Sequence, residues 1–233
     1  MVRNYVPAIL LSALLLLVPL GIIIENLRPD IWNARLWLAM LVPEPNRHTP
    51  QYTNGTYLPP VITKDTTLTA SGSPIVVAGT IRVPAGVTLT IEPGTAIYAA
   101  EFSEIDIEGT LRALGTAQTP ITLSTNEVHP LNQVWNGLIF RPGSAGTISY
   151  TTIAHGAPAI SCLATAVVQG DHLTLTDTLT DVFTTSPRCA FTNSVLRSWQ
   201  DGVIAIGFDP TLTNTKIFAA RELIRKIASQ PVH

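Results

Sequence analysis

The side chains of this chain that are best suited to acid–base chemistry are its carboxylates, and those of the second half are scattered. Between residues 128 and 208 the only ones are Asp171, Asp177, Asp181 and Asp201. General acid–base catalysis needs titratable groups that are positioned together around one reacting bond. The stretch has no Asp-Asp pair and no His-Gly-His or Arg-x-Lys signature. We therefore predict no catalytic residue.

The five histidines also lack the spacing of a metal site. They are His48, His129, His155, His172 and His233, and none forms the spaced pair that zinc sites use. His155 and His172 would approach each other if the interval between them made one turn of a repeating fold, and we interpret them as a stacked surface pair. The chain has no Gly-x-Ser-x-Gly elbow, phosphate-binding loop or dinucleotide fingerprint. We predict no metal and no cofactor.

The two cysteines and the net charge exclude further classes of protein. Cys162 and Cys189 are too few for a disulfide framework, so they form either one disulfide or two packed thiols. The formal net charge is −2 and the isoelectric point is about 6.2. Nucleic-acid binding needs a basic stripe, which this sequence lacks, so we expect no nucleic-acid partner.

The first structural element that the sequence predicts is an apolar segment near the amino terminus. The chain is 46% hydrophobic and 13% charged, and residues 8–24 carry no charge; as a helix they would span ~25 Å. A cleaved signal peptide is the alternative, but no small-x-small cleavage site follows Ile24. We predict an uncleaved transmembrane anchor in 1–27, formed by Ala8, Ile9, Leu10, Leu14, Leu17, Leu20 and Ile24.

Two short segments follow the predicted anchor. Residues 28–42 carry Trp32, Arg35 and Trp37, which predicts either an interfacial amphipathic helix at the headgroup level or a helix packed on the folded domain. Residues 43–62 are rich in proline and predict an extended linker. We expect a single-pass protein of the bacterial cytoplasmic membrane, with the following domain on the periplasmic or extracellular side.

The body of the chain, 63–208, reads as an all-β repeat. Val87, Leu89 and Ile91 alternate with threonines, which predicts a strand with one buried face. Residues that we expect to point inward recur every 16 or 17 positions at Leu89, Ile105, Ile121 and Leu138. That spacing predicts a solenoid whose strands stack ~4.8 Å apart. A β-sandwich is the alternative that short strands and frequent turns also allow.

Three stretches carry a resemblance to a known family: VPAGVTLTIEPGTAI (83–97), IEGTLRALGTAQTPITLST (107–125) and WNGLIFRPGSAGTISYTTIAHG (135–156). They resemble bacterial right-handed parallel β-helix repeat proteins of the membrane-anchored surface or periplasmic type. The resemblance covers residues 70–206 and implies six or seven coils. Members of that family include polysaccharide lyases, hydrolases, adhesins and inert surface modules, so the resemblance implies a fold and not an activity.

The carboxyl-terminal segment, 209–233, has the spacing of an amphipathic helix. Ile217, Ala220, Ile224 and Ile227 share one helical face, and Asn214 can cap its start. We expect this helix to cover the open end of the solenoid; the alternative is docking on a partner or on anionic lipid. Candidate partner contacts are Ile217, Ile224 and Trp135, and Trp135 has ordinary packing as its alternative.

These observations together predict a non-catalytic scaffold or accessory subunit. Its β-helix would be presented outside the cytoplasm to a membrane protein complex, so the expected partners are integral membrane proteins and the lipid bilayer. The alternative is a cell-surface protein that binds or cleaves polysaccharide. In pectin-active members of the family, catalytic residues lie on neighbouring coils of one face, and the later carboxylates of this chain are not spaced in that way.

Overall fold

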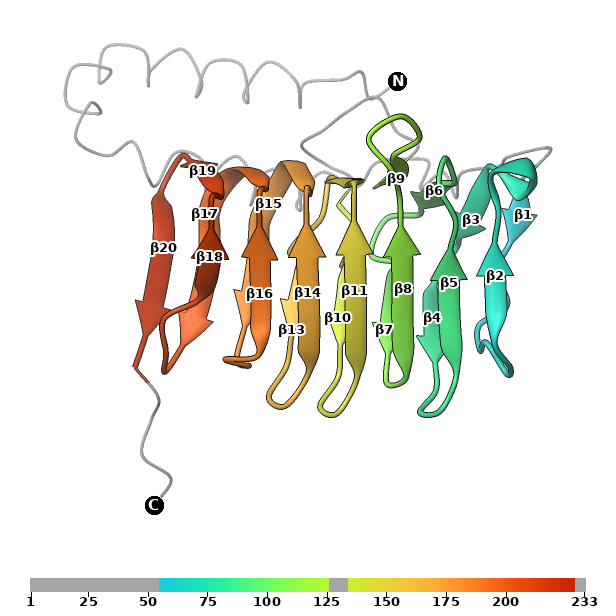
Figure 1. Cartoon of the computed structure of the whole chain (residues 1–233), viewed down its shortest axis with the longest axis horizontal. Coiled ribbons are helices and arrows are strands. Elements are labelled where there is room, and N and C mark those ends of the chain that lie inside the picture. Colours follow the sequence, from blue (N-terminus) through green and yellow to red (C-terminus); the bar gives the residue numbers. More distant parts are fainter. Residues whose placement is uncertain (1–54, 126–133, 229–233) are drawn as a thin grey trace, which may run out of the picture. The chain divides into compact units, whose positions relative to one another are not determined.

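The computed structural model describes residues 55–125 and 134–228, and these form a right-handed parallel β-helix of about seven turns (Figure 1). Every strand pair in the described residues is parallel, which confirms the solenoid and excludes the sandwich of antiparallel sheets. The predicted anchor, with Trp32, Arg35 and Trp37 after it, lies outside the described residues. So does the linker up to residue 54.

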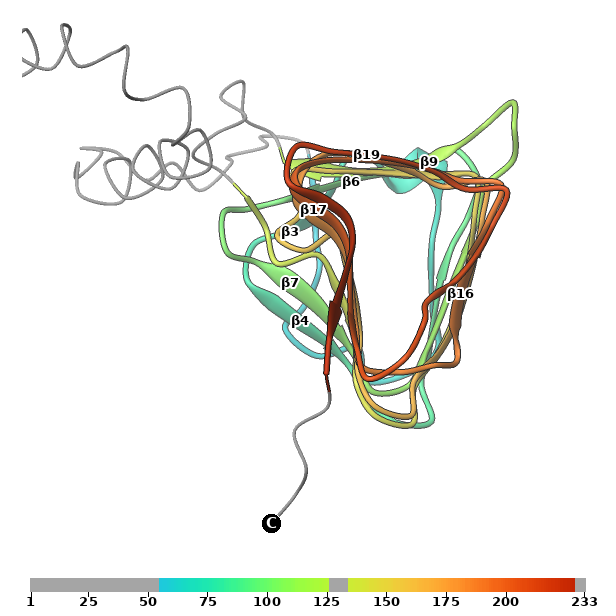
Figure 2. The same ribbon diagram turned by 90° about the vertical axis from the view of Figure 1, so that its left-hand side faces the viewer.

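Each coil contributes one strand to each of three rows, which form the three sides of the outline in Figure 2. The first row contains β4 (Thr80–Val83), β7 (Glu104–Ile107), β10 (Leu138–Phe140), β13 (Ile160–Cys162), the second halves of β15 (Thr174–Thr184) and β17 (Val195–Ile206), and β20 (Glu222–Ile227). The second row contains β1 (Thr56–Tyr57), β3 (Ile75–Val77), β6 (Ala96–Ala99), β9 (Ile121–Thr125), β12 (Thr151–Ala154), the first halves of β15 and β17, and β19 (Lys216–Ala219). The third row contains β2 (Thr66–Leu68), β5 (Thr88–Ile91), β8 (Thr110–Leu114), β11 (Ala145–Ser149), β14 (Val167–Asp171), β16 (Cys189–Thr192) and β18 (Thr211–Thr213). A single 3-10 turn in the described residues, η3 (Ala70–Gly72), lies between β2 and β3.

The core is built from apolar residues that repeat at the same place in successive coils. In the first row the inward ladder is Ile81, Ile105, Leu138, Ile160, Val182, Val203 and Ile224, each in register with the next. Alternation along each strand sends these side chains inward and their neighbours outward. All but the last are buried, so stacking like residues over like removes a continuous apolar column from water.

The length of a coil, measured in residues, is greater than the repeat that we predicted from the sequence. Within the first row, equivalent residues such as Ile160, Val182 and Val203 are 22 and 21 positions apart. Leu89 lies in the third row and Ile121 in the second, so neither is equivalent to Ile105 or Leu138. A coil has three strands and three turns, and the predicted spacing covered only part of it.

One corner of the solenoid repeats a left-handed backbone conformation. Tyr150, His172, Asn193 and Asn214 follow the third-row strands of successive coils and have φ of 44°, 52°, 50° and 48°. Asparagine tolerates this region better than most residues because its short side chain can hydrogen-bond locally. Asn214 therefore turns the chain at a corner and does not cap a helix.

The predicted carboxyl-terminal helix is wrong, because residues 211–227 form the strands β18, β19 and β20. Ile217 pairs with Leu196 and Ile224 with Val203, so each extends an inward ladder. Apolar residues three and four apart fit a helical face, but the exposed edge of the preceding coil offers backbone hydrogen bonds that an isolated helix cannot match. Among the described residues there is no helix that could cross a bilayer.

The solenoid is also longer than the predicted 63–208. Thr56 and Tyr57 pair with β3, and Val61 bridges to Arg82. These residues fall in the segment that we predicted as a linker, where the prolines masked a strand that belongs to the first coil.

Candidate functional site

The first candidate site is a set of charged and polar residues on the outward side of the first row, here called the charged face: Thr80, Arg82, Glu104, Asp106, Glu108, Asn136 and Arg141. Arg82 donates from Nε and Nη2 to the two carboxylate oxygens of Glu108, both at 2.7 Å. Arg141 donates in the same way to Asp106, at 2.7 and 3.2 Å. Each pair joins one coil to the next, because β4, β7 and β10 are neighbours.

The ion pairs shift the pKa values of some of their members. The hydrogen bond from Arg82 holds the pKa of Glu108 below its ordinary value, and Asp106 raises the pKa of Arg141. Glu104 accepts hydrogen bonds from Asn136 at 3.2 Å and Thr80 at 3.3 Å. A general acid at neutral pH needs a raised carboxyl pKa, and the pairing with Arg82 shifts the pKa of Glu108 in the opposite direction. The charged face is suited to joining coils and to polar recognition.

Sequence reasoning missed the charged face, although a signal for it was present. Glu104, Asp106 and Glu108 occupy alternate positions, which puts all three carboxylates on the outward side of one strand and its following turn. Arg141 lies beside Asp106 only because β10 stacks directly on β7, and that long-range match is not visible in the spacing.

The second candidate site lies at the left-handed corner. Asp171 accepts hydrogen bonds from Thr192 Oγ1 at 2.6 Å and Asn193 Nδ2 at 2.8 Å, and its Oδ2 lies 2.7 Å from His172 Nδ1. These groups, the Thr192 hydroxyl foremost, lower the pKa of Asp171 to about 2. The His172 ring stacks on Tyr150 with 4.4 Å between centroids.

The corner brings a carboxylate and an imidazole together without a nucleophile. The Thr192 hydroxyl donates to Asp171 and not to His172, so the order of a catalytic triad is absent from this group. The predicted pairing of His155 with His172 is wrong: His155 bonds to Ser124 at a different corner, because a coil is longer than the interval between the two histidines. Nowhere in 55–125 or 134–228 do three or more metal-binding side chains gather.

Of the other residues that we predicted to contact a partner or to form a disulfide, some are buried and some are exposed. Trp135 is fully buried and donates from Nε1 to the Ala154 carbonyl at 2.9 Å, so it packs in the core and offers no surface to a partner. Cys162 and Cys189 are both free and buried, and burial raises the pKa of the Cys162 thiol. The disulfide stays a prediction. Ile217 is half-buried and Ile224 is exposed.

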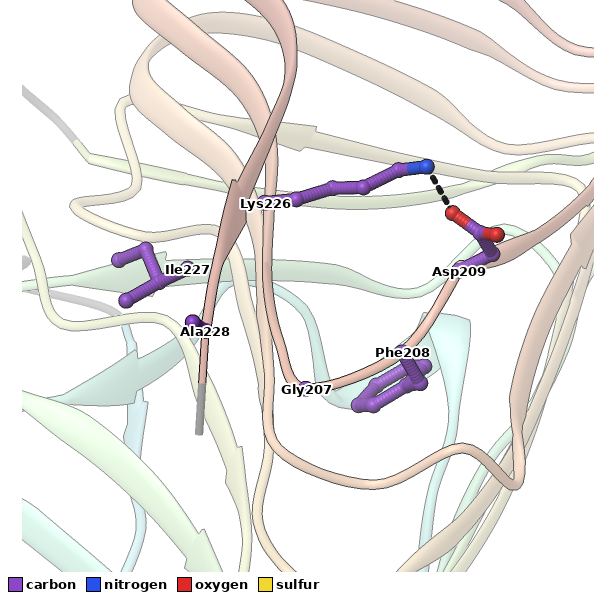
Figure 3. Close-up of a pocket in the computed structure, with 6 residues that line it drawn as sticks. All are labelled: Gly207, Phe208, Asp209, Lys226, Ile227 and Ala228. Carbon is purple, nitrogen blue, oxygen red and sulfur yellow. Dashed lines mark ion pairs between the residues drawn. The ribbon is translucent and has the colours of Figure 1, made fainter. Parts of the chain in front are cut away.

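The third candidate site is a group of exposed apolar side chains on the last two coils. Five of the eight exposed large hydrophobic residues in the described parts of the chain belong to it: Trp199, Phe218, Leu223, Ile224 and Ile227. We call these five the terminal apolar surface. The Arg197 guanidinium lies 4.5 Å from the Phe218 ring centroid. Beside the surface is an open pocket, crossed by an ion pair between Lys226 and Asp209 and lined also by Gly207, Phe208, Ile227 and Ala228 (Figure 3).

Comparison with known proteins agrees with the fold. A family model described as a pectate-lyase like beta helix domain matches residues 60–163. The matched range contains the charged face and ends before the corner at Asp171 and the terminal apolar surface. A search of the curated proteins found no match to the chain, and a search of the solved structures found none.

Proposed function

We propose that this chain, which carries a pectate-lyase-like β-helix domain, is a non-catalytic scaffold or accessory subunit that presents its solenoid to a membrane protein complex. The observation that carries the proposal is the terminal apolar surface. Single exposed apolar residues are ordinary, whereas several large ones gathered in one part of a folded protein favour a contact site there. Its members all belong to the last part of the solenoid, from Trp199 to Ile227.

The carboxylates of the charged face support a non-catalytic role. Asp106 and Glu108 are each held by an arginine of a neighbouring coil, and Glu104 by Asn136 and Thr80. Their hydrogen-bonding capacity is directed at the protein itself. The uncharged stretch 8–24 supports attachment to the bilayer, with the solenoid on the periplasmic or extracellular side.

Affinity purification from native membranes tests the proposal. We expect the detergent-solubilised full chain to retain a defined set of integral membrane proteins, and to migrate on blue-native electrophoresis well above the 25.0 kDa of the chain. Phe218→Ser with Leu223→Ser should release that set. Phe102→Ser is the matched control, because Phe102 is exposed on a different part of the solenoid. Retention of the same set by both variants would contradict the proposal.

A second function, binding or cleavage of polysaccharide, is favoured by the charged face. Its two arginines and three acidic residues lie on adjacent coils inside the matched range 60–163. We would measure retention of the full chain on immobilised acidic and neutral polysaccharides, and the release of shortened products. Retention that Arg141→Gln abolishes would support this function over the first.

A further inference from the structure

We propose that two copies of the chain associate end to end through their last coils, with β20 of one copy antiparallel to β20 of the other across a twofold axis. The proposal rests on the proposed function in one respect, because it names a second copy as an occupant of the surface that includes Ile224 and Ile227. It adds to that function a closed assembly of two solenoids.

The last coil has a free backbone edge. β18 pairs with β16, and β19 and β20 pair with β17, while none of the three has a second partner among the described residues. The N–H and C=O groups of such an edge pair readily with another strand. Natural proteins usually cover or blunt an edge of this kind, and inward-pointing charges are one way to blunt it. Glu222 and Lys226 are such charges on β20, so this edge favours an added strand whose own charges match them.

Within residues 55–125 and 134–228 nothing covers the apolar core at the same end. Ile224 continues the ladder of Val182 and Val203, which are fully buried, yet it is 41% exposed. Its exposure has one cause, namely that no coil follows it in the described stack. A further layer of strand would bury it as its predecessors are buried.

The order of side chains along β20 is self-complementary. Glu222, Ile224 and Lys226 point inward, because they are in register with Asp201, Val203 and Ala205, which are buried. An antiparallel pair centred on Ile224 sets that residue against its own copy. The same register places Glu222 opposite Lys226 of the second copy, and by symmetry this happens twice. Directly opposite charges on neighbouring strands stabilise their pairing.

Other registers lose this match. Moving the second strand by one residue would set Ile224 opposite Arg225 and Glu222 opposite Ile227, which mixes inward with outward side chains. Within one chain both charges already have exposed partners. Lys226 pairs with Asp209 (Figure 3), and Glu222 Oε2 lies 3.9 Å from Arg225 Nε. In the centred register each would exchange that partner for the opposite charge of the second copy.

A twofold contact also closes the assembly. It uses one end of each solenoid and leaves no further copy of that surface exposed. Stacking the first coil of one chain on the last coil of another would instead repeat without end and produce a filament. The self-complementary charges require only the carboxyl-terminal end, which favours the dimer.

Charge reversal with subunit mixing tests the proposal. We expect native mass spectrometry and sedimentation equilibrium of the detergent-solubilised full chain to show a dimer. Glu222→Lys or Lys226→Glu alone should weaken dimerisation at least tenfold, because like charges then meet twice. An equimolar mixture of the two variants should form a heterodimer, because each altered residue then meets its opposite charge.

The controls separate this proposal from the proposed function. Arg112→Glu, an exposed charge reversal on β8, should leave the dimer intact, and circular dichroism should show every variant folded. A monomeric wild type, single variants that dimerise like wild type, or a mixture that stays monomeric would each overturn the dimer. Recovery of integral membrane proteins is measured in the same samples. If a monomeric chain recovers them, only the dimer is contradicted. If the chain is a dimer and recovers none, only the scaffold function is contradicted.

Discussion

Phe140 occupies the space that a side chain at Gly146 would need. A Cβ atom built on Gly146 would lie 2.5 Å from Phe140 Cε1, inside van der Waals contact. Phe140 is fully buried in β10, and Gly146 lies between Leu111 and Val168 in the third-row ladder. The core therefore balances a large side chain in one row with a missing one in another, as close packing requires.

Gly146→Ala should destabilise the protein through this contact. Overpacking a filled core costs about 1–3 kcal/mol, so thermal unfolding followed by circular dichroism should show a lower midpoint. Gly79→Ala is the matched control, because nothing lies within 4 Å of a Cβ at Gly79. Adding Phe140→Leu to Gly146→Ala should cost less than the sum of the two single changes. Equal stability of Gly146→Ala and wild type would show that the core adapts.

Asp181 should make stability depend on pH. Its side chain is buried, and burial raises its pKa from 3.8 to about 7, although a hydrogen bond from Thr178 opposes the shift. The folded protein then keeps a proton that the unfolded chain has already released. Its contribution to stability is complete below pH 4 and is lost as pH rises through 7.

Asp181→Asn should remove this pH dependence. The variant keeps an oxygen that can accept from Thr178 and has no charge to bury, so we expect it to exceed wild type at pH 8 by up to about 4 kcal/mol. Midpoints of urea unfolding at pH 4, 6 and 8 measure the effect. Parallel pH profiles for variant and wild type would mean that Asp181 is not the group responsible.

The two ion pairs of the charged face should differ in their effect on stability. Asp106 keeps only 14% of its side-chain surface exposed, whereas Arg82 is 51% exposed and Glu108 32%. Arg141→Gln leaves a partly buried carboxylate without its cation, which costs more than losing an exposed pair. We expect a clear fall in melting temperature for Arg141→Gln and little change for Arg82→Gln. The reverse order would indicate that the Arg82 pair carries the inter-coil contact.

A feature of the fold or of the candidate sites could be predicted from the sequence only where the residues that determine it lie close together in the chain. Leu89 and Ile91 show their alternation within β5, so the strand could be predicted locally. The solenoid, which was predicted from recurring strands and from the family resemblance, is confirmed. The coil length was not predictable in the same way, because Ile105 and Leu138 are equivalent and the extra residues between them hide the repeat. Ile217 and Ile224 fitted a helix by spacing, and only the edge of the preceding coil decides for strands.

The charged face shows the same limit. The alternation of Glu104, Asp106 and Glu108 is local and was available from the sequence. The partners Arg82 and Arg141 lie 26 and 35 residues from Glu108 and Asp106, so pairing them requires the register between coils. Function depends on such long-range matches more than the fold does, which is why the solenoid could be predicted and its surfaces could not.

The state of Cys162 and Cys189 gives a last prediction. Both thiols are buried inside the solenoid and free, so a reagent cannot reach either sulfur in the folded chain, and burial also raises the pKa of Cys162. We expect an aromatic disulfide reagent to leave the native full chain unmodified over an hour and to titrate two thiols per chain after unfolding in guanidinium without reductant. Cys189→Ala should reduce the unfolded count to one. If the unfolded wild type, purified from membranes, titrates no thiol until reductant is added, the two cysteines are bridged in the cell, as an oxidising compartment outside the cytoplasm would allow.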